Sequence, residues 1–121
     1  MHVLASGSNK KWKRRKLVIK VTVLYPNEEG KKFDFDYYIE THIPMIVRLL
    51  SPMGLVKREI ERGVSNTDPN EPAPFICVGH LHFTTTDEVH EAFKTHGREI
   101  LSDIKNYTEI QPTFQISEVL V

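Results

Sequence analysis

Three histidines carry most of the chemistry that this sequence could perform. His80 and His82 stand two residues apart in an apolar run, so they share one face if that run is a strand. His42 follows Tyr38 by four residues, a spacing that places both side chains on one face of a helix. An imidazole titrates near neutral pH, and a neighbouring phenol can orient it or bind a substrate oxygen. The pattern favours proton transfer, with His42 as the principal catalytic candidate and His80 or His82 assisting it.

Each of these residues also has a structural interpretation. His42 can be a buried residue that stabilises the backbone around Pro44, and His80 and His82 can be polar groups lining a cavity. Tyr107 can close the mouth of such a cavity or pack on the end of a helix. Two histidines on a strand hold a metal only with further ligands. No carboxylate stands at a convincing spacing, so we expect no metal.

Motifs that bind an organic cofactor or build a nucleophile are absent from the sequence. There is no phosphate-cradling glycine loop and no Ser-His-Asp spacing. The single cysteine, Cys77, falls in an apolar run and is expected in the core. We therefore expect no cofactor. Because Cys77 has no partner for an intramolecular disulfide, a reducing, cytoplasmic location is favoured.

Length and composition are typical of one globular domain. The chain has 121 residues, of which 40% are hydrophobic and 26% charged. Such a chain is not disordered, collagen-like or built on disulfides, and it is too short for separate cofactor and substrate domains. No apolar stretch approaches the roughly 18 to 20 residues needed to cross a bilayer, so a transmembrane protein is not expected.

Charge is distributed unevenly along the chain, although the net charge is zero. Residues 1–16 hold six of the 16 basic side chains and no acidic one, so residues 17–121 carry 10 basic against 16 acidic groups. Residues 1–16 lack hydrophobic periodicity and are predicted to be a disordered basic leader. Because the body is acidic and only Trp12 lies among the basic residues, we expect neither nucleic-acid nor membrane binding.

Hydrophobic periodicity predicts six elements. Helices are expected over residues 34–50 and 85–104, and Pro44 either kinks the first or starts a second helical piece. Strands are expected over residues 17–25, 55–64, 75–84 and 113–121. The order is β-α-β-β-α-β. It predicts an α+β, ferredoxin-like fold in which two helices cover one face of a four-stranded antiparallel sheet.

The second face of that sheet has no predicted cover within one chain. Beside Thr22, His80 and His82 it carries the apolar residues Val18, Leu24, Ile76 and Val78. A bare apolar sheet face is unstable in water, so we expect a second copy to cover it and form a homodimer, sheet against sheet. The cavity between the sheets is the expected ligand site, with Thr22 and Val78 as substrate contacts.

Four segments carry a resemblance to a known family, at residues 25–27, 34–44, 79–83 and 103–112. They read Tyr-Pro-Asn, Asp-Phe-Asp-Tyr-Tyr-Ile-Glu-Thr-His-Ile-Pro, Gly-His-Leu-His-Phe and Asp-Ile-Lys-Asn-Tyr-Thr-Glu-Ile-Gln-Pro. In order and spacing they closely resemble the EthD family of the dimeric α+β-barrel superfamily, over residues 17–121. The resemblance implies a small, rather apolar organic ligand and oxygen, isomerase or dehydratase chemistry, without selecting one reaction.

Two functions follow from these observations. The first is a small cofactor-free oxidoreductase or isomerase-type enzyme that uses His42, His80 and His82 for acid–base chemistry, with Tyr38 and Tyr107 among its substrate contacts. The alternative is a non-catalytic accessory or ligand-binding dimer that supports a partner oxygenase. Cavity volume separates the two, because a void below about 100 Å³ is far short of the roughly 300 to 1,000 Å³ of ordinary ligand pockets.

Overall fold

The computed structural model describes residues 16–121, and the leader predicted over residues 1–16 lies outside this range apart from Lys16. Within the range the elements follow the predicted β-α-β-β-α-β order. The strands form one antiparallel sheet in the order β2-β3-β1-β4. Their bounds are β1 (Ile19–Pro26), β2 (Lys57–Arg62), β3 (Phe75–Phe83) and β4 (Thr113–Glu118). The predicted α+β ferredoxin-like class is confirmed.

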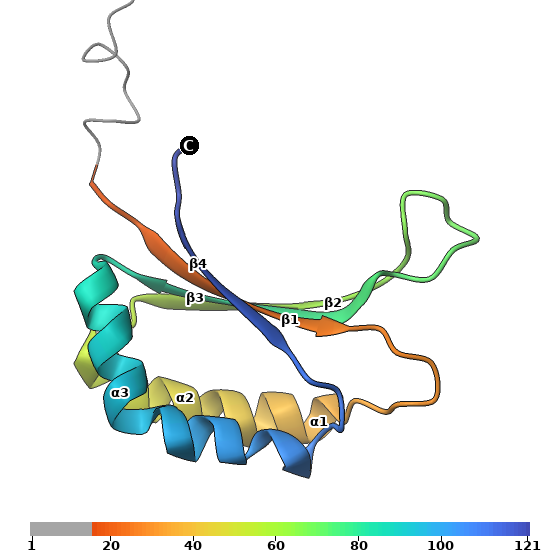
Figure 1. The fold of residues 1–121 in the computed structure, drawn as a ribbon, viewed down its shortest axis with the longest axis horizontal. Helices are drawn as coiled ribbons and strands as arrows, with labels where there is room; N and C mark the ends of the chain where they lie inside the picture. The colour runs from red at the N-terminus through yellow and green to blue at the C-terminus, as the bar shows by residue number, and fades with distance from the viewer. Residues whose placement is uncertain (1–15) are drawn as a thin grey trace, which may run out of the picture.

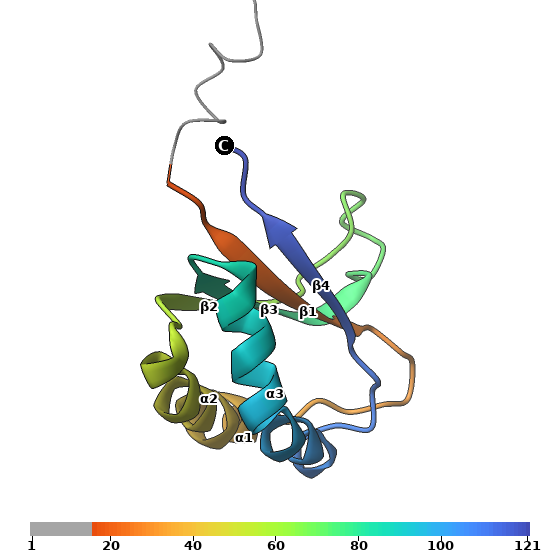
Figure 2. The ribbon, with the colours of Figure 1, turned by 60° about the vertical axis from the view of Figure 1, so that its left-hand side comes forward.

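The described helices all lie on one side of this sheet (Figure 1). The first helical segment comprises α1 (Phe35–Tyr37), a π-helical turn (Tyr38–His42) and α2 (Ile43–Leu50), and the second is α3 (Thr86–Ser102). α2 and α3 pack side by side, as the turned view shows (Figure 2). No part of residues 16–121 covers the opposite face. We call the helix side of the sheet its inner face and the uncovered side its outer face.

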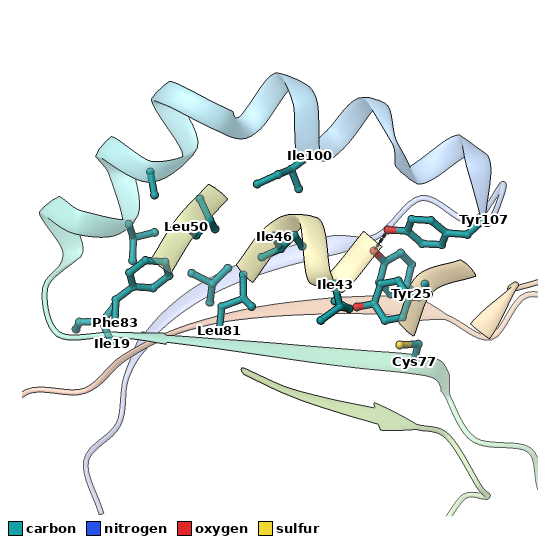
Figure 3. Close-up of a cluster of buried hydrophobic side chains, with 14 of the residues drawn as sticks. Ile19, Tyr25, Ile43, Ile46, Leu50, Cys77, Leu81, Phe83, Ile100 and Tyr107 are labelled. Atoms are coloured by element: carbon teal, nitrogen blue, oxygen red, sulfur yellow. Dashed lines mark hydrogen bonds between the residues drawn. The ribbon is translucent and has the colours of Figure 1, made fainter. Parts of the chain in front are cut away.

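The strand register assigns each side chain to one of these faces. β1 pairs with β3 so that Val21 is opposite Leu81, and both are buried on the inner face. Alternation along the strands then turns the neighbouring pair, Thr22 and His80, to the outer face. The inner side chains meet those of the helices in one core, which includes Ile43, Ile46, Leu50 and Ile100 (Figure 3).

Pro44 explains the irregular first helical segment. A proline has no N–H, and in a regular α-helix its ring clashes with the carbonyl four residues earlier. Here the preceding turn is widened, so that the Ile43 N–H donates to the Tyr38 carbonyl and Pro44 lies in the first turn of α2. The predicted second helical piece is therefore confirmed. The widened turn presents Tyr38 and His42 to the inner face, where both are buried.

Capping fixes where α3 begins, and a short turn follows its end. The Glu88 N–H donates to the Thr85 hydroxyl, and the Glu88 carboxylate accepts from the Thr85 N–H, each at 3.1 Å. After α3 a 3₁₀ turn (Ile104–Asn106) leads to Tyr107, which is buried. This turn brings Asp103 and Tyr107 beside the π-helical turn.

Candidate active site

His42 lies on the inner face of the sheet and is 2% exposed. Its Nδ1 lies 2.8 Å from Oδ2 of Asp103, and its Nε2 lies 3.3 Å from the hydroxyl oxygen of Tyr107. Because an ionised carboxylate only accepts hydrogen bonds, the Nδ1–H group of His42 donates to Asp103. In the neutral ring Nε2 is then the acceptor, and it is the nitrogen that can take up a proton.

Two tyrosines continue this chain of hydrogen bonds. Since Nε2 of His42 accepts, the Tyr107 hydroxyl donates to it, and its oxygen accepts from the Tyr25 hydroxyl at 2.6 Å. Figure 3 marks the bond between the two tyrosines with a dashed line. The Tyr38 ring stacks on His42, with centroids 5.5 Å apart and 18° between the planes. We call the hydrogen-bonded series Tyr25, Tyr107, His42 and Asp103 the His42 relay.

Asp103 is the member of the relay that sequence reasoning missed. It follows the last residue of α3 and accepts two further hydrogen bonds at Oδ1, from the Tyr37 hydroxyl at 2.7 Å and the Asn106 amide at 2.8 Å. A signal for it was present, since Asp103, Asn106 and Tyr107 all fall in the last of the four segments that resemble a family. The contact with His42 spans 61 residues of sequence, so spacing alone could not reveal it.

Burial sets the protonation of the relay at neutral pH. Burial lowers the pKa of His42, and the hydrogen bond and charge of Asp103 only partly oppose this. Burial also disfavours ionisation of Asp103, yet the hydrogen bonds that it accepts outweigh this and hold the pKa of the carboxyl below its usual range. Burial raises the pKa of Tyr25 to about 12 and also raises the pKa of Tyr107. At pH 7 the imidazole is therefore neutral, the carboxylate charged and both phenols protonated.

A narrow chamber lies beside the relay, between the sheet and the helices. Its volume is about 20 Å³, which is enough for about one water molecule. Tyr25, Tyr38 and His42 line it. The rest of its wall is mostly apolar and includes Leu81, Phe93, Ile100 and Phe114. Any substrate larger than a water molecule must displace part of this wall to reach His42.

His80 and His82 lie on the outer face, away from the relay. β3 alternates between buried and half-buried residues, and both histidines belong to the half-buried set. Nδ1 of His80 lies 3.5 Å from the Thr22 hydroxyl, and its Nε2 lies 3.4 Å from a carboxylate oxygen of Glu61. The expectation that His80 or His82 assists His42 is therefore corrected, because the sheet separates the two groups.

The predicted substrate contacts divide between the two faces. Tyr38 and Tyr107 lie against His42, whereas Thr22 and Val78 lie on the outer face and are half-buried. For Tyr107 the sequence left two roles open, closing the mouth of a cavity or packing on the end of a helix. The residue is 3% exposed under the inner face, because the 3₁₀ turn after α3 directs it inward, and so it does not lie at the mouth of a cavity between two sheets.

Glu59, Glu61 and His80 form a group of potential metal ligands on the outer face. Each offers one ligand atom, and these atoms lie within 4.8 Å of one another. The sequence showed no suitable carboxylate spacing because both glutamates come from β2 and reach His80 only through strand pairing. Both glutamates are exposed, and Glu61 is paired with His80. The group is therefore a surface charge cluster in this structure.

Comparison with solved structures agrees with the fold. The chain is similar to an EthD-like protein from Ralstonia eutropha, with 36% identity, a TM-score of 0.82 and coverage of 88% of this chain and 96% of that chain. It is also similar to an ethyl tert-butyl ether D (EthD) family protein from Bacillus halodurans, with 22% identity, a TM-score of 0.60 and coverage of 84% and 98%. A third similar structure is SnoaB from Streptomyces nogalater, a cofactor-independent oxygenase, with 12% identity, a TM-score of 0.55 and coverage of 88% and 94%.

Other comparisons do not identify a family for this chain. A scan against protein-family models and a search of curated proteins give no match. The likeness to SnoaB, at 12% identity, shows a common fold alone. Within residues 16–121, no helix has both the length and the apolar character that a bilayer crossing requires. Family information therefore comes from the Ralstonia eutropha protein, whose match extends over 88% of this chain.

Proposed function

Because the chain belongs to the EthD family, with 36% identity over 88% of its length to an EthD-like protein, we propose that it is a small enzyme in which His42 is a general base for an apolar organic substrate. The observation that carries the proposal is the buried His42 relay. Burial lowers the pKa of His42, Asp103 holds Nδ1, and Nε2 faces a hydroxyl. Geometry and protonation state are thus both set before a substrate arrives, as a general base requires.

In the proposed reaction, Nε2 of His42 accepts a proton from an acidic group of the substrate. Asp103 keeps the ring oriented and stabilises the imidazolium that forms. The bond from Tyr107 to Nε2 is long at 3.3 Å, so it is weak. A substrate proton can therefore replace the Tyr107 hydrogen at Nε2. Tyr25 holds the Tyr107 phenol in place through the 2.6 Å bond.

Two outcomes of this proton transfer fit the proposal. Return of the proton to another carbon atom is an isomerisation. If the proton comes from an acidic C–H group, the carbanion that forms can add dioxygen, which is the oxidant. A C–O bond forms, and His42 returns its proton to the resulting peroxide, so no cofactor is needed. SnoaB, a cofactor-independent oxygenase, shares this fold. We place the oxidative reaction first, because it also matches the oxygen chemistry that the family resemblance implies.

Oxygen uptake tests the proposal. Purified protein is incubated with apolar phenols and aromatic ketones, dioxygen consumption is followed with an electrode, and isomerised products are sought by mass spectrometry. For a compound that is turned over, His42→Gln is expected to lower kcat/KM by about 10² to 10⁴, the usual contribution of a positioned base. A decrease below about threefold, under about 1 kcal/mol, would remove His42 from this role. His96→Gln, half-buried on α3, is the matched control.

We also propose that a second copy covers the outer face, giving a homodimer. Leu24 and Val78 are paired there, and with Ile76 they are apolar and only half-buried. Apolar surface of this kind is stable when a partner covers it. Sedimentation equilibrium at micromolar concentration is expected to give a dimer for the wild type and a monomer for Val78→Glu. A monomeric wild type would contradict the proposal.

A non-catalytic accessory role is the alternative that one observation favours. The chamber beside His42 measures about 20 Å³, against the roughly 300 to 1,000 Å³ of ordinary ligand pockets. In this alternative the relay is structural and the protein supports a partner oxygenase. Native mass spectrometry separates the two functions. A copurified organic molecule released on denaturation supports the enzyme, whereas no adduct and no turnover across the panel support the accessory role.

A further inference from the structure

An open groove lies next to the narrow chamber of His42, between α3 and β4. Its volume is about 310 Å³, which falls within the range of small-molecule sites. β4 is one of the two edge strands of the sheet, and the groove lies between it and α3. The walls are apolar, and Leu101, Phe114 and Ile116 in them are 43 to 46% exposed. The groove opens on the inner face, opposite the face that the proposed dimer covers.

Phe93 and Phe114 line both the groove and the chamber of His42. We call these two rings the aromatic partition. Phe93 belongs to α3 and Phe114 to β4, the two elements that flank the groove. The wall common to the two cavities thus consists of side chains, and side chains change rotamer without unfolding the backbone. The two rings are therefore part of a wall that the 310 Å³ groove and the 20 Å³ chamber share.

Gly97 lies beside one residue of the aromatic partition, Phe93. It is buried in the middle of α3, where a glycine costs about 1 kcal/mol relative to alanine. A Cβ atom at this position would meet only Phe93, at 3.8 Å from its Cβ and 3.9 Å from its Cδ1, which is ordinary contact. No neighbouring element therefore requires a glycine here. The missing side chain leaves room for one methyl group in contact with Phe93.

The side of the groove formed by α3 also carries one positive charge. It belongs to Lys94, which is exposed and lies one helical turn from His90 in the groove wall. An apolar molecule in the groove that carries a carboxylate or an acidic hydroxyl would place its acidic group beside Lys94. The apolar walls and the cationic rim thus define one class of ligand.

We infer that the groove binds a flat apolar molecule with one acidic group, and that the aromatic partition opens to admit the reactive end of this molecule to His42. This inference rests on the proposed function, since the groove supplies the space for a substrate that the 20 Å³ chamber lacks. Binding in the groove can nevertheless be measured without turnover, so the two ideas can fail separately.

Titration with 2-naphthoate, followed by isothermal calorimetry, tests the groove. Ile116→Glu places a carboxylate in the apolar wall and is expected to weaken binding by about tenfold or more. Lys94→Met removes the cationic partner and is expected to weaken binding by about threefold, while binding of neutral 2-naphthalenemethanol stays unchanged. Arg48→Met is the matched control, because Arg48 is an exposed basic residue that lines a different pocket, on α2. Undetectable wild-type binding, or equal affinity in Ile116→Glu, would overturn the inference.

Gly97→Ala tests the partition. The added methyl group is expected to raise the Tm by about 4 °C through helix propensity, while holding the Phe93 ring against the chamber. In the wild type, 2-naphthoate is expected to shift the NMR signal of the His42 ring. In Gly97→Ala this shift is expected to be lost although calorimetric binding in the groove remains. An undiminished His42 shift in the stabilised variant would overturn the role of the partition.

His42→Gln distinguishes this inference from the proposed function. The variant is expected to keep calorimetric binding of 2-naphthoate, because position 42 is not part of the groove wall. If Ile116→Glu loses binding while His42→Gln keeps full turnover, the groove is supported as the binding site and His42 is rejected as the general base. If turnover depends on His42 but no ligand binds in the groove, the groove is rejected as the binding site and His42 is supported as the general base.

Discussion

The two faces of the sheet carry histidines that differ in burial and in their hydrogen-bond partners. On the inner face His42 is 2% exposed and bound to a carboxylate at 2.8 Å, and that carboxylate partly opposes the effect of burial on its pKa. On the outer face the pKa of His82 is also lowered, first by burial and then by the nearby charges of Lys57 and Lys20. The two shifts have the same direction, yet only His42 has a partner that fixes its ring. A lowered pKa therefore does not mark a catalytic base unless geometry also orients it.

The largest expected difference between the two faces is in catalysis. With a compound that is turned over, His42→Gln is expected to lower kcat/KM by about 10² to 10⁴. His82→Gln is expected to stay within about threefold, because the sheet separates His82 from the relay. Steady-state kinetics of both variants check this. Equal losses in the two variants would mean that the outer face takes part in the reaction.

The next largest effect is expected at the carboxylates. Asp103→Ala leaves the donors of His42, Tyr37 and Asn106 without their acceptor, and is expected to lower the free energy of unfolding by about 2 to 3 kcal/mol. Glu61→Ala on the outer face is the matched control and is expected to change it by about 0.5 kcal/mol or less. Urea denaturation measures both. If Glu61→Ala lowered the free energy of unfolding as much as Asp103→Ala, the outer cluster of Glu59, Glu61 and His80 would stabilise the fold as much as the relay does.

Removal of single hydroxyl groups is expected to have a smaller effect. Tyr107→Phe deletes the buried bonds to Tyr25 and His42, and is expected to cost about 1 to 2 kcal/mol of stability. Thr22→Val on the outer face removes only a 3.5 Å contact with His80, and is expected to cost less than about 0.5 kcal/mol. Thermal unfolding compares the two variants. If Tyr107→Phe left the stability unchanged, the hydrogen bonds of Tyr107 to Tyr25 and His42 would not stabilise the fold.

The smallest expected effect is on the pH dependence of stability. Since the pKa of folded His42 lies below its unfolded value near 6.5, the unfolded chain binds more protons in the window between the two. The free energy of unfolding therefore falls as pH decreases through this window, by at most about 1.4 kcal/mol per pH unit for one histidine. Above about pH 7 this contribution is constant, since both states are neutral.

Urea denaturation between pH 5 and 7.5 separates the two histidines that contribute to this slope. His42→Gln is expected to remove the larger part, because His42 is more deeply buried than His82. His82→Gln is expected to remove a smaller part of the same sign. If His82→Gln removed the larger part of the pH dependence, protonation of His82 would affect stability more than protonation of His42, which would contradict the expectation.

Much of the fold could be predicted because it depends on local patterns. The period of two in residues 17–25 and 75–84 predicted which side chains are buried, and Pro44 predicted the broken first helix. The candidate site was predicted only in part. His42 and Tyr38 lie four residues apart on one helical segment, so their proximity is local. For Tyr107 the sequence left two roles open, at a cavity mouth or against the end of a helix, and it could not place the residue beside His42.

The sequence by itself determined the order of the elements, the buried faces of β1 and β3 and the pairing of Tyr38 with His42, because each of these follows from the repeat of a helix or a strand. Tertiary structure alone decided that Asp103 reaches His42 across 61 residues, that Tyr25 and Tyr107 meet across 82 residues, and that the sheet separates His42 from His80. Contacts of this kind depend on how helices pack on a sheet. Helix and strand periods specify which face of an element is buried, but not which distant polar side chain lies beneath it.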